Sequence, residues 1–427
     1  MTSTIAPTLD FARAADADDP IAALRDEFVI PPSRVHDDGR SCVYLVGNSL
    51  GCMPRNVPSA INAELDAWQR LGVDAHLQGD HPWYTFHEAL SEPGARLVGA
   101  LPGEVVFMNA LTVNLHLMMV SFYRPTPKRH KIIIEDSAFP SDRYAAASQI
   151  ASHGYDPQTS LIRLRPRQGE RVLRDEDITS FLRTDGGDVA LVLLPGVNYL
   201  SGQVFDIAGI TAAARDAGCA IGWDLAHAAG NIPLHLHDWA PDFACWCSYK
   251  YLNAGSGAVS GCFVHQRHHA RDDLVRFSGW WGNDPSTRFE MGEGFVPVHS
   301  ADAWQISNPP IFSMAPLRVS LEQIDRATMD ALRTKSLRLG AFALALLDEI
   351  PGVEVLTPRE PGRRGCQLSI VVGERAREVH ARLAEQGIMI DFRSPDVLRV
   401  APVPLYNTYA DVYGFADALR HVLAQRP

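Results

Sequence analysis

Residues 220–250 read AIGWDLAHAAGNIPLHLHDWAPDFACWCSYK, and this stretch contains two apolar runs that each lead to a charged side chain. The first run reaches Asp224 and the second reaches Lys250. Short apolar runs bounded by polar residues are typical of strands buried on both faces of a sheet. The carboxyl ends of parallel strands meet at one edge of the sheet, where ligands bind. The pattern therefore predicts a carboxylate and an amine at the same edge.

Similar apolar runs alternate with helical stretches on both sides of this segment. Predicted helices include residues 142–153 and 207–217, and the second of these ends at Gly218. The predicted strands cover residues 105–108, 131–134, 160–164, 189–194, 220–223, 243–247 and 258–264. This alternation predicts an α/β fold in which a mostly parallel seven-stranded sheet is covered by helices on both faces.

The rest of the chain is expected to form a smaller α/β domain. A long helix is predicted over residues 316–347, after the pair Pro309-Pro310. Predicted strands at 367–372, 388–392 and 398–401 and helices at 375–386 and 409–424 follow it, and a short helix is predicted at 21–28. We expect an N-terminal arm (1–45) that packs with the small domain, a large cofactor-binding domain (46–312), and a linking helix with the small C-terminal domain (313–427).

Composition limits the partners of the protein. The 427 residues carry 39 Lys and Arg against 50 Asp and Glu, a formal net charge of −11. This acidic field repels phosphate backbones and anionic lipids, which disfavours nucleic acid and membranes as partners. The N-terminal residues carry no secretory pattern, and the seven cysteines lie mostly in apolar segments, as reduced thiols do. A cytoplasmic protein is therefore expected.

Lysine is rare in this chain, and that makes one lysine conspicuous. Only four of the basic residues are lysines: Lys128, Lys131, Lys250 and Lys335. Three of them have polar or charged neighbours in the sequence and are expected to be solvated. Lys250 instead follows a buried strand, where the pKa of an amine falls easily and the amine becomes a good nucleophile. The alternative is a strand-end lysine whose ammonium reaches solvent.

The combination of Asp224, His227 and Lys250 favours a pyridoxal phosphate site. A lysine binds the aldehyde of that cofactor covalently, and a carboxylate keeps its pyridine nitrogen protonated so that the ring accepts electrons. Asp224 taken alone is equally well explained as a helix cap. The three residues together at strand ends are much harder to explain by chance.

Two further segments suit the same cofactor. Residues 108–112 (MNALT) pass from a strand to a helix with no large charged side chain, which leaves backbone N–H groups free for a phosphate. Residues 139–142 (FPSD) open the next helix, and Phe139 can stack on a pyridine ring. An ordinary strand–helix turn and a core phenylalanine are the alternatives for these two segments.

Rival cofactors have weaker support. The paired spacing of metal sites is missing from Cys245-x-Cys247, from His235-x-His237-Asp238 and from His265 with His268-His269, so no metal is predicted. No Gly-x-Gly-x-x-Gly follows a predicted strand, which disfavours a nicotinamide dehydrogenase.

The chain resembles the kynureninase family in seven segments that occur in order along the sequence. They are YLVGNSLG (44–51), MNALTVNLH (108–116), FPSD (139–142), WDLAHA (223–228), CWCSYKYLNAG (245–255), ISNPP (306–310) and RVAPVPLYN (399–407). Kynureninases are homodimeric pyridoxal phosphate enzymes of fold type I, the aspartate aminotransferase fold. The resemblance implies hydrolysis of L-kynurenine to anthranilate and L-alanine, and of 3-hydroxy-L-kynurenine to 3-hydroxyanthranilate and L-alanine, in tryptophan degradation and NAD-precursor metabolism.

The resemblance also implies roles for residues at matching positions. Lys250, Asp224 and Tyr249 would be catalytic. The cofactor would be bound by Leu111, Thr112, Phe139, Pro140, Ser141, Asp142, Asp224, His227, Tyr249 and Lys250, together with Trp280 and Asn308 from the neighbouring subunit. The substrate would be bound by Ser49, His76, Asn308 and Arg399, with Arg399 on its carboxylate.

Two positions depart from the family pattern, and other functions stay open. Pro195 stands where many relatives have Ser or Thr, and Asn283 stands where some have His. The alternatives are another fold type I lyase or transaminase, a cysteine desulfurase, for which Cys366 looks structural, and a non-catalytic binder of the cofactor. Retention of Lys250, Asp224 and Arg399 together argues against the binder.

Overall fold

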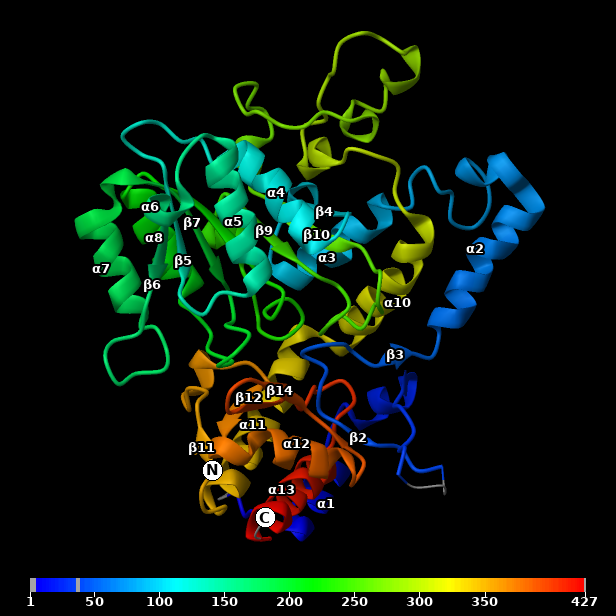
Figure 1. Ribbon diagram of the computed structural model, residues 1–427. Helices are drawn as coiled ribbons and strands as arrows, with labels where there is room; N and C mark the ends of the chain where they lie inside the picture. The colour runs from blue at the N-terminus through cyan, green and yellow to red at the C-terminus, as the bar shows by residue number, and fades with distance from the viewer. Residues whose placement is uncertain (1–4, 36–38, 426–427) are drawn as a thin grey trace.

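A seven-stranded sheet forms the centre of the larger body in this computed structural model, which describes residues 5–35 and 39–425 (Figure 1). Its strands are β4 (Val105–Met108), β5 (Lys131–Glu135), β6 (Leu161–Leu164), β7 (Val189–Pro195), β8 (Ala220–Asp224), β9 (Phe243–Trp246) and β10 (Ser260–Val264). Their order is β4-β10-β9-β8-β7-β5-β6, and only β10 runs antiparallel to its neighbours. The predicted α/β fold with a mostly parallel seven-stranded sheet is confirmed.

Helices cover both faces of this sheet because successive side chains of a strand point to opposite faces. Ile132 and Ile134 of β5 pack with α4 (Leu111–Phe122) and α5 (Pro140–Ser152). Ile133 packs in the opposite layer, which holds α7 (Asp175–Asp185) and α8 (Ile207–Asp216). Strands β4, β7 and β10 are almost entirely buried, as their unbroken apolar sequence indicated.

Further helices complete the larger body. They are α2 (Val57–Leu71), η2 (Gly72–His76), η3 (Glu88–Leu90), α3 (Ser91–Val98), η4 (Pro102–Glu104), α6 (Pro157–Ser160), η5 (Gly186–Asp188), α9 (Leu236–Trp239), η6 (Gln266–His268), η7 (Trp280–Gly282), η8 (Arg288–Glu290) and η9 (Ala301–Trp304), where η denotes a 3₁₀ helix. Among the described residues, no helix combines the length and apolar character that crossing a membrane requires.

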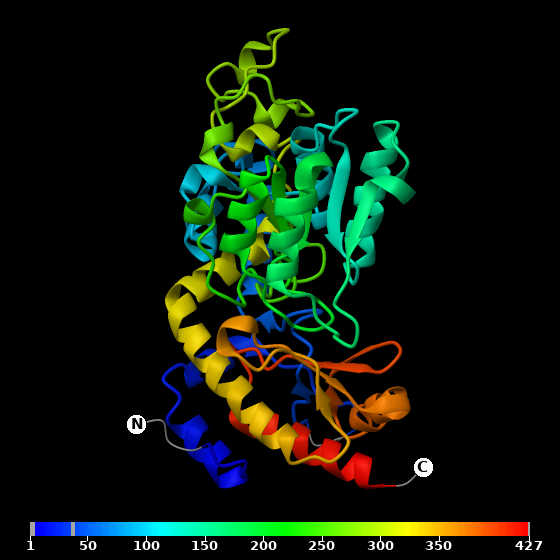
Figure 2. The same ribbon diagram turned by 90° about the vertical axis from the view of Figure 1, so that its left-hand side faces the viewer.

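The predicted long helix over 316–347 is wrong in one respect, because the chain forms two helices there. α10 (Ile311–Ala327) and α11 (Met329–Asp348) meet at Thr328, whose φ of 63° lies in the left-handed region. The hydroxyl of Thr328 accepts a hydrogen bond from Ala331 N at 3.3 Å and so caps α11. Figure 2 shows the two helices running from the larger body to the smaller one.

The smaller body has its own antiparallel sheet in the order β11-β12-β15-β14. Its elements are β11 (Glu354–Val355), η10 (Pro361–Arg363), β12 (Leu368–Val371), η11 (Gly373–Arg375), α12 (Ala376–Ala384), β14 (Asp391–Arg393), β15 (Val397–Val400) and α13 (Tyr409–Ala424). The predicted strand 388–392 is split, because β13 (Ile388–Met389) pairs with β2 (Val43–Tyr44) and β14 pairs with β15. The predicted helix 409–424 is confirmed.

The N-terminal residues lie beside the C-terminal helix (Figures 1 and 2). They form α1 (Leu9–Ala17), η1 (Ala22–Glu27) and β1 (Phe28–Val29), which pairs with β3 (Met53–Pro54). The Asp16 carboxylate accepts hydrogen bonds from Tyr409 N (2.7 Å) and Ala410 N (3.0 Å), which caps α13. The division of the chain after residues 45 and 312 stays a prediction.

Lys335 is not solvated, which corrects the expectation from its charged neighbours in the sequence. Its side chain is 5% exposed, and its ammonium lies 2.8 Å from the equally buried Asp19 carboxylate. The pair joins α11 to the N-terminal arm. Spacing on a helix could not predict it, because the partner lies more than 300 residues away in the sequence.

Asp19→Asn is expected to lower the free energy of unfolding by about 3–5 kcal/mol, because it leaves the Lys335 ammonium buried without a counter-charge. The double change Asp19→Leu with Lys335→Met should have a much smaller effect, because it removes both charges. Urea denaturation of the two proteins measures the difference. Equal losses in both variants would contradict a role for the charge pair.

Candidate active site

A cavity of about 380 Å³ lies at the carboxyl ends of β5, β7 and β8, beside the segment that follows β9. It is lined by the predicted residues Leu111, Thr112, Phe139, Ser141, Asp142, Asp224, His227, Tyr249 and Lys250, and also by Pro195. Pro140, the first residue of α5, lies between Phe139 and Ser141, which both line the cavity. Residues far apart in the sequence thus meet at the sheet edge where the strand pattern placed them.

Lys250 is held by a histidine. Its Nζ lies 3.0 Å from Nε2 of His227, which is buried. Burial and the nearby Lys250 cation lower the pKa of His227 well below its usual value, so the imidazole is neutral at pH 7. Nε2 can then accept a hydrogen bond from the lysine, and Nδ1 has no partner among the described residues. His227 therefore orients the amine without adding a second positive charge.

Asp224 and Asp142 both line the cavity, and their carboxyl groups are close neighbours. Asp224 ends β8, and its Oδ1 accepts a hydrogen bond from Ala226 N at 2.8 Å, so it does cap the following turn. Burial and the Asp224 carboxylate raise the pKa of Asp142 well above its usual value. The raised pKa favours the protonated form of Asp142. A protonated pyridine nitrogen suits this buried pair of carboxyl groups, because it would compensate negative charge there.

Glu135 is a further acidic residue of the cavity that the sequence reasoning missed. It ends β5, is buried, and accepts a hydrogen bond from Asn198 Nδ2 at 2.7 Å. Burial raises the pKa of Glu135 to about 7. The available signal was its place at the end of an apolar run, the same signal that identified Asp224.

The N-termini of α4 and α5 meet at the cavity. Ala110, the N-cap of α4, makes no side-chain capping bond, so the first N–H groups of a 12-residue helix remain free. Thr112 Oγ1 and Ser141 Oγ lie 2.7 Å apart and join the first turns of the two helices. Free N–H groups, hydroxyls and the positive ends of two helix dipoles suit a phosphate group. The residues present therefore fit pyridoxal phosphate.

Arg399 and Ser49 do not line this cavity but lie directly behind it. Arg399, on β15, is 1% exposed and donates from Nη1 to the carbonyl oxygen of Tyr199, a residue that lines the cavity (2.7 Å). Its Nη2 donates to Ser49 Oγ at 3.2 Å and to the Asp391 carboxylate. Burial lowers the pKa of Arg399 to about 10. Tyr199 and Asp391 were not identified from the sequence.

Ser49 is placed by the segment that follows it. Gly51 N donates to Tyr249 O at 2.9 Å, which fastens this segment to the turn that carries Lys250. A side chain at position 51 would collide with the carbonyl of Lys250, so only glycine allows the contact.

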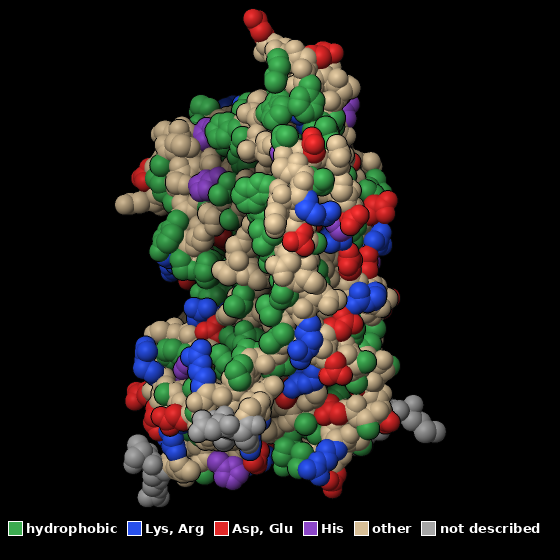
Figure 3. All heavy atoms as spheres, turned by 90° about the vertical axis from the view of Figure 1, so that its right-hand side faces the viewer, with side chains coloured by type: hydrophobic (Ala, Val, Ile, Leu, Met, Phe, Trp, Pro, Cys, Tyr) green, Lys and Arg blue, Asp and Glu red, His purple; other side chains and the backbone are tan. Residues whose placement is uncertain are grey.

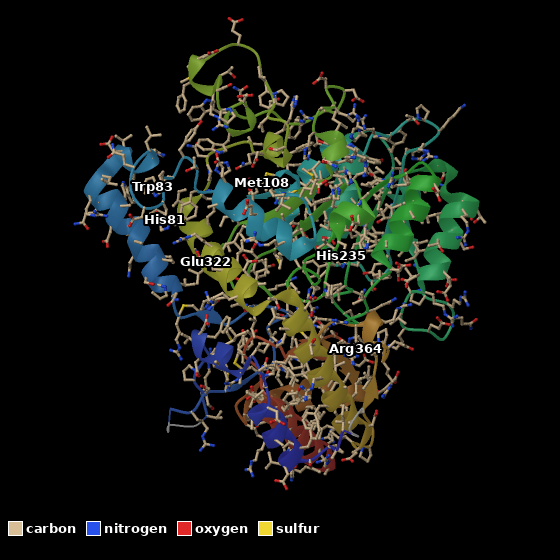
Figure 4. The ribbon with its side chains drawn as sticks, turned by 180° about the vertical axis from the view of Figure 1, so that it is seen from behind. His81, Trp83, Met108, His235, Glu322 and Arg364 are labelled. Carbon is tan, nitrogen blue, oxygen red and sulfur yellow. The ribbon has the colours of Figure 1, made fainter. Side chains whose placement is uncertain are left out.

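Three predicted site residues lie away from the cavity of the single chain. His76 ends η2 and is exposed, and its ring meets Trp83, which Figure 4 places at the outer edge beside α2. Trp280 and Asn308 are also exposed. Asn283, one of the departures from the family pattern, accepts a hydrogen bond from Val296 N at 2.7 Å and shapes the loop after η7.

One group of potential metal ligands occurs among the described residues, made by Glu104, His237 and His265. The two imidazoles are stacked with planes only 12° apart, so a single ion could not lie in both ring planes. Glu104 is instead occupied by hydrogen bonds from Leu101 N, Gln266 N and His237. The hydrogen bonds of Glu104 thus link η4 to α9 and to η6.

Comparisons with known proteins point to one family. A family model described as the kynureninase C-terminal domain matches residues 332–419. Kynureninase of Myxococcus xanthus is 54% identical over 411 residues, and kynureninase of Salinispora tropica is 55% identical over 415 residues, each match covering 96% of both chains. Kynureninase of Nematostella vectensis is 45% identical over 433 residues, which cover 96% of this chain and 93% of that one.

Solved structures confirm the predicted fold. A C-DES mutant with glycine covalently linked to its PLP cofactor has a TM-score of 0.76 at 17% identity, covering 88% of this chain and 96% of that one. The cysteine desulfurase CsdA from Escherichia coli has a TM-score of 0.74 at 18% identity, covering 94% and 98%. These structures share the fold type I architecture. Because about half of its residues match those of kynureninases along nearly its whole length, this chain belongs to the kynureninase family.

Proposed function

We infer that this chain carries out the reaction after which its family is named, as a hydrolase that depends on pyridoxal phosphate. It cleaves the Cβ–Cγ bond of L-kynurenine to give anthranilate and L-alanine, a step of tryptophan degradation, and 3-hydroxy-L-kynurenine gives 3-hydroxyanthranilate in the same way. The observation that carries this is full-length identity of about half, combined with Lys250 and Asp224 in one cavity. The purified protein with kynurenine should release fluorescent anthranilate. No fluorescence from protein loaded with the cofactor would overturn the inference.

The cysteine desulfurase alternative lacks a suitable thiol. All seven cysteines are buried, and Cys366 is fixed by a hydrogen bond from its N to Asn231 Oδ1 at 2.9 Å. A desulfurase needs a mobile thiol that receives sulfur. The likeness to CsdA therefore extends to the fold alone.

Bound pyridoxal phosphate supplies a protonated pyridine ring that accepts electrons from the substrate. Lys250 Nζ takes the Cα proton of the substrate and returns it later in the reaction, and His227 holds this amine by the 3.0 Å contact. Asp224 and Asp142 keep the pyridine nitrogen protonated. Thr112, Ser141 and the free N–H groups of α4 would bind the phosphate, with Tyr249 beside them, and Phe139 would stack on the ring.

Arg399 is proposed to bind the α-carboxylate of the substrate, with Ser49 beside it. Its planar guanidinium offers parallel N–H donors that match a carboxylate. Tyr199 O and Ser49 Oγ hold two of its nitrogens in place. His76 and Asn308 are proposed as polar groups near the substrate ring. A cytoplasmic location of the protein is a separate proposal.

Arg399→Lys is expected to raise KM for kynurenine by roughly 30-fold or more, because a lysine cannot form two parallel hydrogen bonds to one carboxylate. Arg375→Lys, in an exposed ion pair with Glu378, is a matched control and should leave KM unchanged. Steady-state kinetics with both variants tests this. An unchanged KM in Arg399→Lys would rule out the proposed carboxylate contact.

A homodimer with shared active sites is proposed from the exposed apolar side chains of the larger body. Trp68 on α2 packs against Phe312 of α10, and both are exposed. Trp280 and Phe289 are exposed on the loop around η7. Figure 3 shows hydrophobic side chains gathered on the upper part of this face, whereas charged ones dominate its lower part. Such a patch is typical of a protein interface.

Lys250→Ala and Asn308→Ala proteins, each inactive, should regain about a quarter of wild-type activity when mixed in equal amounts. Random exchange makes half of the dimers mixed, and one of the two sites in a mixed dimer has both native residues. Native mass spectrometry confirms that subunits exchange. Exchange without recovered activity would contradict the donation of Asn308 across the interface.

A further inference from the structure

Asp391 lies opposite Arg399 in the sheet of the smaller body. The two residues are paired in the antiparallel ladder of β14 and β15, so their side chains project from the same face at neighbouring positions. The Asp391 Oδ2 atom accepts hydrogen bonds from Arg399 Nη2 and from Ser49 Oγ, the latter at 2.9 Å. One oxygen thus organises both residues proposed to bind the substrate carboxylate.

The same oxygen has a third donor. Arg393 is two residues along β14, which places it on the same face, and its Nη2 lies 3.1 Å from Asp391 Oδ2. The side chain of Arg393 is 40% exposed, whereas that of Arg399 is 1% exposed. Asp391 therefore stands between one arginine in the interior and one that reaches solvent.

This arrangement means that Arg399 is already neutralised before any substrate binds. A buried guanidinium without a counter-charge is strongly destabilising, and Asp391 is the carboxylate that removes this penalty. The groups that face Arg399 from the larger body include the side chains of Tyr199, Tyr251 and His227. Burial raises the pKa of Tyr251 well above its usual value and lowers that of His227 well below it. A substrate carboxylate must therefore compete with Asp391 for the Nη2 donor.

We propose that Asp391 is a positioning residue that also acts as an internal competitor of carboxylate ligands. In the free protein it holds Arg399 and Ser49 in place. When a substrate carboxylate occupies Arg399, Arg393 keeps the Asp391 charge compensated. Simple anions then bind weakly at Arg399, and amino-acid substrates, which are also anchored elsewhere in the cavity, bind productively. This inference rests on the proposed role of Arg399.

Asp391→Asn removes the charge that competes with the substrate carboxylate but keeps the contacts that position Arg399 and Ser49. The amide has the same shape, and its oxygen still accepts hydrogen bonds. In the holoenzyme we expect KM for kynurenine to fall about tenfold, and Ki for acetate as a competitive inhibitor to fall at least as much. Asp396→Asn is the matched control, because it removes the same charge from the exposed pair with Arg171. It should change neither constant.

Arg393→Gln provides a second test, in which KM is expected to change in the opposite direction. Without Arg393, Asp391 should stay on Arg399, and KM should rise severalfold while the melting temperature stays close to the wild-type value. KM and Ki values that rise or stay unchanged in Asp391→Asn would overturn the inference and leave Asp391 a structural residue. If Arg399→Lys also leaves KM unchanged, the proposed role of Arg399 has failed instead.

Discussion

Replacing Lys250 by alanine should reduce kcat by at least about 10⁴-fold, because the change removes both the covalent anchor of the cofactor and the base that moves the Cα proton. Two of the other three lysines are already engaged in ion pairs. Lys131 is paired with Asp188 at 2.5 Å, and Lys335 is buried against Asp19. Steady-state kinetics with anthranilate fluorescence measures the loss, and Lys131→Ala is the matched control with unchanged turnover.

The covalent anchor has a direct readout that does not depend on turnover. Borohydride should fix the cofactor to the protein, and peptide mapping should place the label on Lys250. A label on Lys128, Lys131 or Lys335 would contradict the assignment, as would an Lys250→Ala protein that keeps near wild-type turnover.

Two predicted residues that line the cavity were found from the same feature of the sequence. Asp224 and Lys250 follow apolar runs, and the positions of buried parallel strands determine where such residues meet. The same reasoning applies to Glu135, which directly follows the predicted strand 131–134 as Asp224 follows 220–223. The apolar runs of the buried strands therefore carry most of the information about where Asp224 and Lys250 lie.

The substrate end depends on contacts that local patterns do not encode. Arg399 and Asp391 meet through antiparallel strand pairing, but Ser49 reaches them from a segment about 350 residues earlier. Tyr199 holds Arg399 through its carbonyl oxygen, an atom that every residue possesses. Only the resemblance to the family identified Ser49 and Arg399, and nothing in the sequence marked Tyr199 or Asp391.

The break between α10 and α11 was not predicted, because no local sequence pattern marks it. Thr328 takes a left-handed φ of 63° although it is β-branched, a residue type that rarely adopts this conformation. No glycine or proline marks the position. The cap that Thr328 provides to α11 offsets part of the strain, and the surrounding helices fix the geometry.

Asp224→Asn should lower kcat by roughly 10³-fold or more, equivalent to about 4 kcal/mol at the transition state. The amide oxygen can still accept the hydrogen bond from Ala226 N, so the turn after β8 keeps its cap. The amide cannot carry the negative charge that keeps the pyridine nitrogen protonated. The variant thus removes the electrostatic role of Asp224 and leaves its structural role intact.

Asp206→Ala is the matched control for the structural role. Asp206 caps α8 by accepting a hydrogen bond from Gly209 N at 3.0 Å, outside the cavity. Its loss should cost about 1 kcal/mol of stability and leave kcat unchanged. If Asp224→Asn behaves in the same way, Asp224 is a cap and nothing more. If it loses turnover while its melting temperature stays close to that of the wild type, the carboxylate acts on the cofactor, because no structural change then accounts for the loss.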